Sequence, residues 1–567
     1  MDTSYILPFA QLSLFILLHN HTSLANIITD EASLLAFKSH ISSHPNNILA
    51  SNWSSSGPVC SWIGVTCSSR HNRVTALDIS SMQLHGTIPP HLGNLSFLVS
   101  LNISNNAFHG DLPQELARLQ RLKVIDVASN NFTGEIPSFL SLLPKLHIMY
   151  LWSNQFSGSI PSSIFNITTM ETIALTENNL TGKLPKTICD HLPNLKRLYL
   201  SKNSVDGVIP PNLEKCRKLQ ILSLSFNEFI GIVSRELANL TDLTELYLGA
   251  LYLEGEIPME LGNLNKLQVL RLNGNEFTGS VPESIFNMSA LQMIDFGLNK
   301  LSGTLPSDLG RRMPNLEVFI CGGNNLSGFI SDSISNSSRL GMFELSFNSF
   351  TGPIPKSLGN LEYLEILNSE MNNLISDSSL SFLTSLTNCR KLGVLQFNEN
   401  ELDGALSASV GNFSNSMQNF QGNGCKLKGV IPREIGNLTG VIHMSLYSNK
   451  LTGHIPNTVQ DMLNLQELYL QSNEIKGTIP NVICSLKNLG ALDLSGNHFS
   501  SLVPSCLGNV TSLRYLNLAY NRLNSRLPAN LGSLQDLIEF NVSSNSLSGH
   551  IPLELGNLKA VTVDTQF

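Results

Sequence analysis

Apolar residues recur along most of the chain in a pattern that fits neither a lone helix nor a lone hairpin. The stretch 267–282, LQVLRLNGNEFTGSVP, has the form L-x-x-L-x-L-x-x-N-x-F-x-G-x-V-P. Because side chains alternate along a strand, Leu270 and Leu272 are expected to point inward and Arg271 to face solvent. Asn275 falls where the chain must bend, and its amide can both donate to and accept from backbone groups. The pattern predicts one coil of a solenoid, which needs a copy on either side to bury its apolar edge.

The repeat is constant over most of the chain. The Asn column, or its substitute, runs from Met82 to Asn545 in twenty coils whose successive members stand 24 or 25 residues apart, with one exception. The exception is the interval of 28 residues from Asn372 to Asn400, in which leucines at helical spacing predict a short extra helix on the outer face. Cys425 stands in the Asn column, and that coil is expected to lose part of the hydrogen bonding.

Residues 26–73 differ from the repeat and predict an N-terminal cap, which the open apolar edge of the first coil requires. Asp30 can cap the start of a helix that runs to about Ser42, because apolar residues recur there at helical spacing. Cys60 and Cys67 bracket a short loop and are expected to form a disulfide in an oxidising compartment.

The first residues predict a signal peptide. The apolar run from Ile6 to Leu18 is too short to span a bilayer comfortably, and Ser23 and Ala25 are small residues at the spacing that signal peptidase prefers. A buried N-terminal element is the alternative. No later stretch holds eighteen uninterrupted apolar residues, so no transmembrane span is expected in this chain. The predicted organisation is a signal peptide at 1–25, a cap at 26–73, repeats at 74–552 with the longer coil at 372–400, and an incomplete last repeat and tail at 553–567.

Composition favours an extracellular protein with a weakly charged surface. Charged residues make up 14% of the chain and the net charge is -8, which gives no electrostatic case for nucleic acid. Fourteen N-x-S/T sequons follow the predicted cleavage site, and together with it they support a glycosylated extracellular protein. The predicted glycosylation sites are Asn52, Asn94, Asn102, Asn131, Asn166, Asn179, Asn239, Asn287, Asn325, Asn336, Asn412, Asn437, Asn509 and Asn541.

The stretch Trp53…Cys60-Ser-Trp62-Ile-Gly-Val-Thr-Cys67, followed by repeats ending in L-x-G-x-I-P-x-x-L-G-N-L, closely resembles the extracellular region of plant leucine-rich-repeat receptor-like kinases. The inserted SDSSLSFLTSLTNC resembles the subfamily that includes receptors for bacterial flagellin and elongation-factor peptides. The resemblance covers nearly the whole chain. It implies an α/β leucine-rich-repeat solenoid, a curved superhelical horseshoe with a parallel β-sheet on its concave side.

The same resemblance implies a protein that is secreted or placed on the extracellular face of the plasma membrane. Its concave face would recognise a peptide or protein ligand in plant immune or developmental signalling, with a leucine-rich-repeat co-receptor kinase as a candidate partner. The alternative is a soluble secreted repeat protein that inhibits an extracellular enzyme, similar to the plant inhibitors of polygalacturonase.

Members of this family usually continue into a closing cap, a transmembrane helix and a Ser/Thr kinase domain. In this sequence the repeat predicts leucine-like residues at 564 and 566, where Asp564 and Gln566 stand, and no kinase motif occurs. We therefore expect no enzymatic activity, and either a truncated receptor, a partial gene product or a soluble variant.

No residue pattern predicts a catalytic site, a metal site or a cofactor. The histidines are dispersed without a cysteine at zinc spacing, and no nucleophile stands with a base. Aromatic and basic residues gather instead at outward strand positions of the fourth to ninth coils, and such residues dominate binding hot spots. The alternative is that aromatic residues favour strands and simply cover the sheet. The predicted ligand-binding residues are Tyr150, Trp152, Tyr199, Lys202, Phe226, Tyr247 and Arg271, with a weaker group at Tyr447, Tyr469, Tyr515 and Tyr520.

Overall fold

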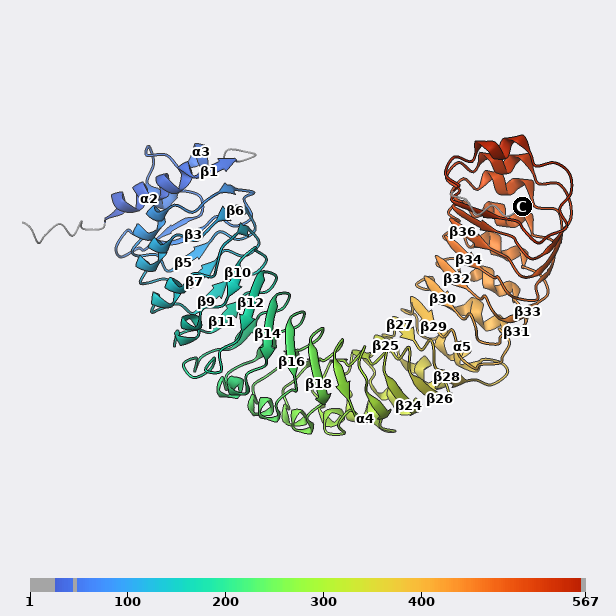
Figure 1. Ribbon diagram of the computed structural model, residues 1–567, viewed down its shortest axis with the longest axis horizontal. Coiled ribbons are helices and arrows are strands. Elements are labelled where there is room, and N and C mark those ends of the chain that lie inside the picture. Colours follow the sequence, from blue (N-terminus) through green and yellow to red (C-terminus); the bar gives the residue numbers. More distant parts are fainter. Residues whose placement is uncertain (1–25, 44–47, 562–567) are drawn as a thin grey trace, which may run out of the picture. The chain divides into compact units, whose positions relative to one another are not determined.

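The computed structural model describes residues 26–43 and 48–561, which form two compact units divided between Ile230 and Gly231. The predicted signal peptide and positions 564 and 566 lie outside the described residues. Within each unit every coil adds a short strand to a parallel sheet, and most coils add a second short strand and a 3-10 helix on the other side (Figure 1). The predicted leucine-rich-repeat solenoid with a parallel sheet is confirmed.

The N-terminal segment begins with helix α2, Ile27–Ser39. Asn26 caps it, because the Asn26 side chain accepts a hydrogen bond from the Thr29 amide at 3.1 Å. The prediction that Asp30 is the cap is therefore wrong. Asp30 lies in the first turn and is fully buried, and its carboxylate accepts hydrogen bonds from the Arg73 guanidinium at 2.7 and 2.8 Å. A buried guanidinium requires a charged partner, and this requirement fixes the position of Asp30.

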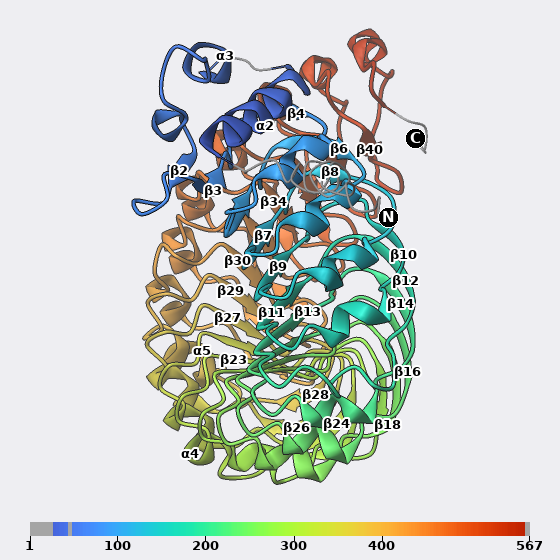
Figure 2. The same ribbon diagram turned by 90° about the vertical axis from the view of Figure 1, so that its left-hand side faces the viewer.

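The predicted end of this helix at Ser42 is also wrong. Strand β1, Ile41–Ser43, follows the helix and pairs antiparallel with β4, His85–Gly86, of the first coil. A second antiparallel pair joins β2, Val65–Cys67, to β3, Val74–Asp78. Together with α3, Ile48–Asn52, these elements lie at the end of the first unit (Figure 2). The N-terminal segment thus closes the apolar edge that the first coil would otherwise expose.

The first unit continues as a regular stack of coils. Neighbouring sheet strands pair in parallel without a shift, as in Met149, Ile173 and Leu198, which are aligned and have no exposed surface. The remaining sheet strands are β5 Ser100–Asn102, β7 Val124–Asp126, β9 Ile148–Tyr150, β11 Thr172–Ala174, β13 Arg197–Tyr199 and β15 Ile221–Ser223. The second strands are β6 Ala107–Gly110, β8 Asn131–Phe132, β10 Ser157–Ser159, β12 Asn179–Lys183, β14 Ser204–Val208 and β16 Glu228–Gly231. The 3-10 helices are η1 Val59–Ser61, η2 Pro90–Asn94, η3 Gln114–Arg118, η4 Ser138–Leu142, η5 Ser162–Asn166 and η6 Pro211–Lys215.

The second unit repeats this arrangement. Its sheet strands are β17 Glu245–Tyr247, β19 Val269–Arg271, β21 Met293–Asp295, β23 Val318–Ile320, β25 Met342–Glu344, β27 Ile366–Asn368, β29 Val394–Gln396, β30 Asn419–Gln421, β32 His443–Ser445, β34 Glu467–Tyr469, β36 Ala491–Asp493, β38 Tyr515–Asn517 and β40 Glu539–Asn541. The second strands are β18 Tyr252–Glu256, β20 Glu276–Thr278, β22 Ser302–Thr304, β24 Asn325–Phe329, β26 Ser349–Pro353, β28 Asn373–Ile375, β31 Lys428–Val430, β33 Lys450–Thr452, β35 Lys476–Gly477, β37 His498–Ser501 and β39 Arg522–Leu523.

Helices occupy the opposite side of the second unit from the sheet (Figure 1). They are α4 Leu309–Arg312, α5 Ser381–Leu386, η7 Arg235–Asn239, η8 Met259–Asn263, η9 Ile285–Asn287, η10 Asp332–Asn336, η11 Lys356–Asn360, η12 Ala408–Asn412, η13 Arg433–Asn437, η14 Asn457–Asp461, η15 Asn481–Ser485, η16 Ser505–Asn509, η17 Ala529–Ser533 and η18 Leu553–Asn557. The extra helix expected in the long coil is α5. Asp377 holds its first turn by accepting from the Ser381 amide at 2.9 Å, and hydrogen bonds from Ser381 depress the pKa of the Asp377 carboxyl.

The Asn column forms a hydrogen-bonded ladder between coils. Asn275 donates to the carbonyl oxygens of Leu248, Leu272 and Asn273 at 2.8, 3.0 and 3.3 Å, and accepts from the Leu253 amide at 3.1 Å. The pattern recurs in other coils and explains why the column favours a side chain that both donates and accepts.

Six of the nine cysteines are paired. The disulfides are Cys60–Cys67, Cys189–Cys216 and Cys484–Cys506, and the buried free thiols belong to Cys321, Cys389 and Cys425. The two later disulfides each join consecutive coils on the helical side. The sequence left the Cys189–Cys216 pairing open, because it does not determine how close the two side chains lie.

Candidate ligand-recognition surface

The solvent-facing side of the parallel sheet, here called the sheet face, carries the predicted ligand-binding residues. In the first unit Tyr150 and Tyr199 end strands β9 and β13, and the short side chain of Ala174 lies between them in register. Trp152 follows Tyr150 by two residues and is 41% exposed. With Arg197, these side chains line one shallow hollow. The structure thus brings three of the predicted residues together over a small floor residue.

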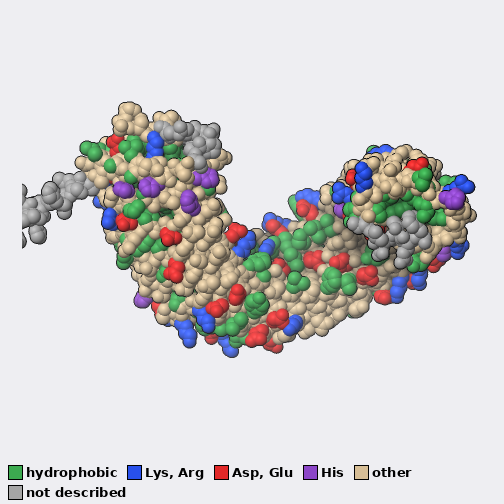
Figure 3. Space-filling model, turned by 45° about the horizontal axis from the view of Figure 1, so that its top comes forward, with side chains coloured by type: hydrophobic (Ala, Val, Ile, Leu, Met, Phe, Trp, Pro, Cys, Tyr) green, Lys and Arg blue, Asp and Glu red, His purple; other side chains and the backbone are tan. Residues whose placement is uncertain are grey.

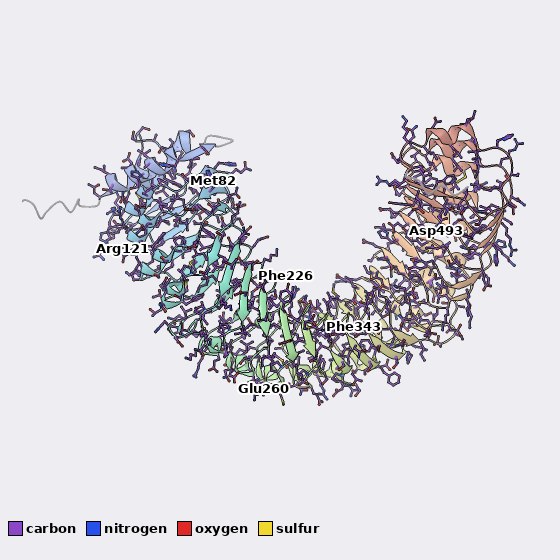
Figure 4. The ribbon with its side chains drawn as sticks, viewed as in Figure 1. Met82, Arg121, Phe226, Glu260, Phe343 and Asp493 are labelled. Atoms are coloured by element: carbon purple, nitrogen blue, oxygen red, sulfur yellow. A yellow bond between two sulfur atoms is a disulfide. The ribbon has the colours of Figure 1, made fainter. Side chains whose placement is uncertain are left out.

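Lys202 and Phe226 occupy equivalent places in two consecutive coils of the first unit, directly before the ladder asparagine. Both have a left-handed backbone with φ of 57°. The Lys202 ammonium lies 3.5 Å from a carboxylate oxygen of Glu177, and both side chains are exposed. Phe226 is 58% exposed and projects from the sheet side in Figure 4, whereas Glu260 lies on the helical side of the second unit. The aromatic ring of Phe226 therefore contributes surface to solvent rather than to the core.

The last two predicted residues belong to the second unit. The Tyr247 hydroxyl donates to a Glu245 carboxylate oxygen at 2.7 Å. The Arg271 guanidinium carbon lies 5.8 Å from the centre of the Tyr247 ring, and two of its nitrogens contact the Met293 sulfur at 3.2 Å. Tyr247 and Arg271 thus hold each other's orientation on adjacent strands. The seven predicted residues are consequently shared between the units, five in the first and two in the second.

A second hollow, which the sequence did not indicate, lies on the sheet face of the second unit. Its walls include Leu298 and Phe347, which are 69% and 50% exposed, and its floor includes Gly297 and Gly322. Figure 3 shows that exposed hydrophobic side chains gather in patches, with acidic side chains between them. The hollow could have been found from the sequence, because Leu298 and Phe347 stand directly before ladder asparagines where most coils have Ser, Gly or Asn.

Two carboxyl groups on the sheet face, the half-buried Asp126 and the buried Asp295, have altered acidities. Burial raises the pKa of Asp126 in the first unit, and the hydrogen bond from the Ala128 amide partly offsets this. Burial likewise raises the pKa of Asp295 in the second unit, against the opposing effects of the Gly297 amide and Arg271. Neither carboxyl group has an ion-pair partner within the described residues.

The predicted glycosylation sites are distributed unevenly between the two sides of the units. Eight end a 3-10 helix, on the side opposite the sheet: Asn94, Asn166, Asn239, Asn287, Asn336, Asn412, Asn437 and Asn509. Asn131, Asn179 and Asn325 begin second strands and are exposed, and Asn52 is half-buried, accepting from the Ile63 amide at 2.6 Å. Only Asn102 and Asn541 end sheet strands, β5 and β40, among the described residues. The sheet face from β7 to β38 therefore carries no sequon.

The described residues contain no group of three or more His, Cys, Asp or Glu side chains placed to hold a metal ion. Over residues 26–43 and 48–561 there is also no helix with the length and apolarity needed to cross a membrane.

Comparison with known proteins identifies the repeat. The model of the leucine rich repeat N-terminal domain matches residues 27–68. Leucine rich repeat models match residues 97–119, 121–143, 145–167, 193–250, 266–288, 464–523 and 536–558.

Plant receptor proteins are similar to the chain both in sequence and in structure. The LRR receptor-like serine/threonine-protein kinase EFR of Arabidopsis thaliana is 46% identical over 70 residues, which are 12% of this chain and 7% of EFR. The chain thus matches a small part of the length of such curated relatives. The crystal structure of the Arabidopsis receptor kinase HAESA, in complex with the peptide hormone IDA and the co-receptor SERK1, has a TM-score of 0.85 and 31% identity, covering 95% of this chain and 89% of that chain. The ectodomain of GASSHO1/SCHENGEN3 from Arabidopsis thaliana, in complex with CASPARIAN STRIP INTEGRITY FACTOR 2, has a TM-score of 0.84 and 30% identity, covering 94% and 69%.

Proposed function

We propose, because the chain belongs to the leucine-rich-repeat ectodomains of plant receptor kinases, that its sheet face recognises a peptide or protein ligand outside the cell. The observation that carries this proposal is the hollow of the first unit, where Tyr150, Trp152 and Tyr199 meet. Exposed aromatic side chains on a rigid sheet bury much apolar surface on contact at little entropic cost, because strand backbones hold them in place.

The other features of the chain support the same role. Its proposed organisation is a signal peptide at 1–25, a cap at 26–73 and repeats at 74–552, which suits a secreted protein or one held at the extracellular face of the plasma membrane. The sheet face from β7 to β38 is free of sequons, so glycans on the proposed sites would leave the recognition surface open. Since HAESA is in complex with a peptide hormone and a co-receptor, we assign this chain a peptide ligand and a leucine-rich-repeat co-receptor kinase as partners, in immune or developmental signalling.

The proposal is tested with a random twelve-residue peptide library displayed on phage and selected on the secreted, glycosylated chain. We expect the wild-type chain to enrich peptides, and the double variant Trp152→Ala/Tyr199→Ala to bind the enriched peptides at least about tenfold more weakly. Tyr252→Ala is the control, because Tyr252 is an exposed aromatic residue outside the sheet face.

Thermal unfolding of each variant separates a loss of binding from a loss of folding. Trp152 is exposed and Tyr199 is half-buried on the sheet face, outside the core, so the melting temperatures should agree with that of the wild-type chain. Failure to enrich any peptide, or equal binding by the double variant and the wild type, would contradict the assignment of the first-unit hollow.

A further inference from the structure

We propose that the second-unit hollow, formed by Leu298, Phe347, Gly297, Gly322, Asp295 and Glu344, binds a peptide segment in which a large apolar side chain stands within one or two residues of a Lys or Arg. This inference rests on the proposed function and adds the chemistry of the ligand. The hollow measures about 500 Å³, which is within the range of small-ligand sites, and it lies wholly in the second unit.

The two apolar side chains that form the walls of the hollow stand on strained backbone and are not buried in the core. Leu298 and Phe347 have φ of 54° and 51°, the left-handed region that branched and bulky side chains disfavour. Some equivalent places hold residues suited to this backbone, for example Asn105 and Gly274. Because at least half of each side chain remains in water, the strain is not offset by burial in this chain. A ligand that covers both side chains would supply the missing burial.

The floor is shaped by glycines that admit the acidic side chains. A Cβ atom on Gly322 would lie 2.7 Å from a Glu344 carboxylate oxygen and 2.9 Å from the Ser346 hydroxyl, closer than such atoms approach. On Gly297 it would lie 3.3 Å from an Asp295 carboxylate oxygen. Glycine at these two places therefore lets both carboxylates lie against the backbone at the base of the hollow.

Each carboxylate is fixed through one of its oxygens. Asp295 accepts from the Gly297 amide at 3.1 Å, and Glu344 accepts from the Ser346 amide at 2.8 Å. Within the described part of the chain, neither second oxygen has a protein donor, although Asp295 is only 8% exposed. The nearest cation on the adjacent strand, Arg271, is engaged with Met293 and Tyr247 instead.

The two carboxylates should make the hollow prefer a positively charged group on the ligand. Asp295, Ile320 and Glu344 occupy the same place on three consecutive strands, so the two carboxylates flank one apolar side chain about 10 Å apart. A cation placed over Ile320 would be attracted by both carboxylates and could donate a charge-assisted hydrogen bond to one of them. An acidic ligand would meet repulsion from both sides. An apolar side chain against Leu298 and Phe347 with a neighbouring Lys or Arg therefore satisfies both parts of the hollow.

The library selection described above also tests this inference. We expect enriched peptides that pair a Leu, Ile, Met, Phe, Tyr or Trp with a Lys or Arg within two positions. The variants Leu298→Ser/Phe347→Ser and Asp295→Asn/Glu344→Gln should each bind such peptides at least about tenfold more weakly. Serine is already accepted at the equivalent place of other coils, so the first variant retains the fold. Leu463→Ser and Glu254→Gln are matched controls, since both residues are exposed in the same unit and neither lines the hollow.

A double-mutant cycle between the ligand and the protein tests whether the ligand cation contacts the carboxylates of Asp295 and Glu344. An enriched peptide is synthesised with Arg, or with the neutral isostere citrulline, in the selected position. The exchange should weaken binding to the wild-type chain by about tenfold or more, and binding to Asp295→Asn/Glu344→Gln by no more than about threefold. Equal loss on both proteins, or enriched peptides without a cation, would overturn the inference. If peptides bind but depend only on Trp152 and Tyr199, the inference fails and the proposed function stands; if no peptide is enriched, both fail.

Discussion

Removal of the Asn275 side chain should weaken the second unit more than the same change one coil later. Asn275→Ala takes away the acceptor of the Leu253 amide and the donor to the Leu248 carbonyl. Both groups belong to residues with no exposed surface. The Leu248 carbonyl depends on Asn275 because the residue that would donate to it from its own coil is Leu251, which has no polar side chain. The carbonyls of Leu272 and Asn273 keep other partners, the Asn299 side chain and the Ala250 amide.

Asn299→Ala is the matched control. It also leaves one amide without an acceptor, that of Phe277. Its carbonyl partners remain bonded, because the Phe296 carbonyl also accepts from Asn324 and the Gly297 carbonyl from the Gly274 amide. An unsatisfied buried polar group costs about 1–3 kcal/mol. Asn275→Ala with two such groups should therefore cost about 2–6 kcal/mol, and Asn299→Ala with one about 1–3 kcal/mol.

Amide hydrogen exchange resolves this difference locally, because each coil of a solenoid contacts only its neighbours. The one additional unsatisfied group in Asn275→Ala costs about 1–3 kcal/mol, which corresponds to about a five- to 150-fold change in an equilibrium constant. The loss of protection that Asn275→Ala causes in peptides covering residues 248–256 should therefore exceed, by that factor, the loss that Asn299→Ala causes around Phe277. Urea unfolding followed by circular dichroism gives the global loss. Equal protection losses in the two variants would refute the reasoning that Leu251 leaves the Leu248 carbonyl dependent on Asn275.

Three further predictions concern the cap, the thiols and pH. Asp30→Ala removes the carboxylate that forms the ion pair with the buried Arg73 guanidinium and should lower the free energy of unfolding by about 3–5 kcal/mol, measured by urea denaturation with tryptophan fluorescence; a loss below about 1 kcal/mol contradicts it. Burial raises the pKa of the Cys389 thiol to about 11 and of the Cys425 thiol to about 12. Iodoacetamide at about pH 8 should therefore label neither thiol in the folded chain, as measured by mass spectrometry. Rapid labelling would contradict this prediction and show the thiols to be accessible. Burial raises the pKa of Asp295 above its usual 3.8, so the contribution of the Asp295 carboxyl group to the free energy of unfolding is complete below that pH and is lost as pH rises through the raised pKa. Between about pH 3.5 and pH 7, Asp295→Asn should therefore lose less stability in urea denaturation than the wild-type chain. An identical pH dependence of the two proteins would contradict this prediction.

The fold could be predicted from the sequence because its determinants recur at fixed spacing. The period places Leu270 and Leu272 inward, and each is buried as the alternation requires. The role of Asp30 could not be predicted, because its partner Arg73 is separated from it by 43 residues and local spacing favours a helix cap. The partner of Cys484 likewise depends on the coil-to-coil register, which brings Cys506 beside it. Contacts within one coil follow from the repeat, whereas contacts of non-repeating residues require coordinates.

The candidate recognition surface was only partly predictable for a related reason. Aromatic residues within strands, such as Tyr150 and Tyr199, are conspicuous in sequence, and the structure places them together with Trp152. Leu298 and Phe347 resemble ordinary apolar members of the repeat by residue type, and only their place directly before a ladder asparagine separates them from the leucines and phenylalanines of the core.

Backbone geometry distinguishes these residues from the core. The place before the ladder asparagine requires a left-handed backbone and directs its side chain to solvent, so a bulky apolar residue there bears strain without gaining burial. Phe226, Leu298 and Phe347 all meet this description, at 58%, 69% and 50% exposure. Packing within its own unit leaves at least half of each side chain in water, and contact with another molecule would bury it. A large apolar residue directly before the ladder asparagine is therefore a stronger indication of a recognition surface than an aromatic residue within a strand, because the strand position carries no comparable cost.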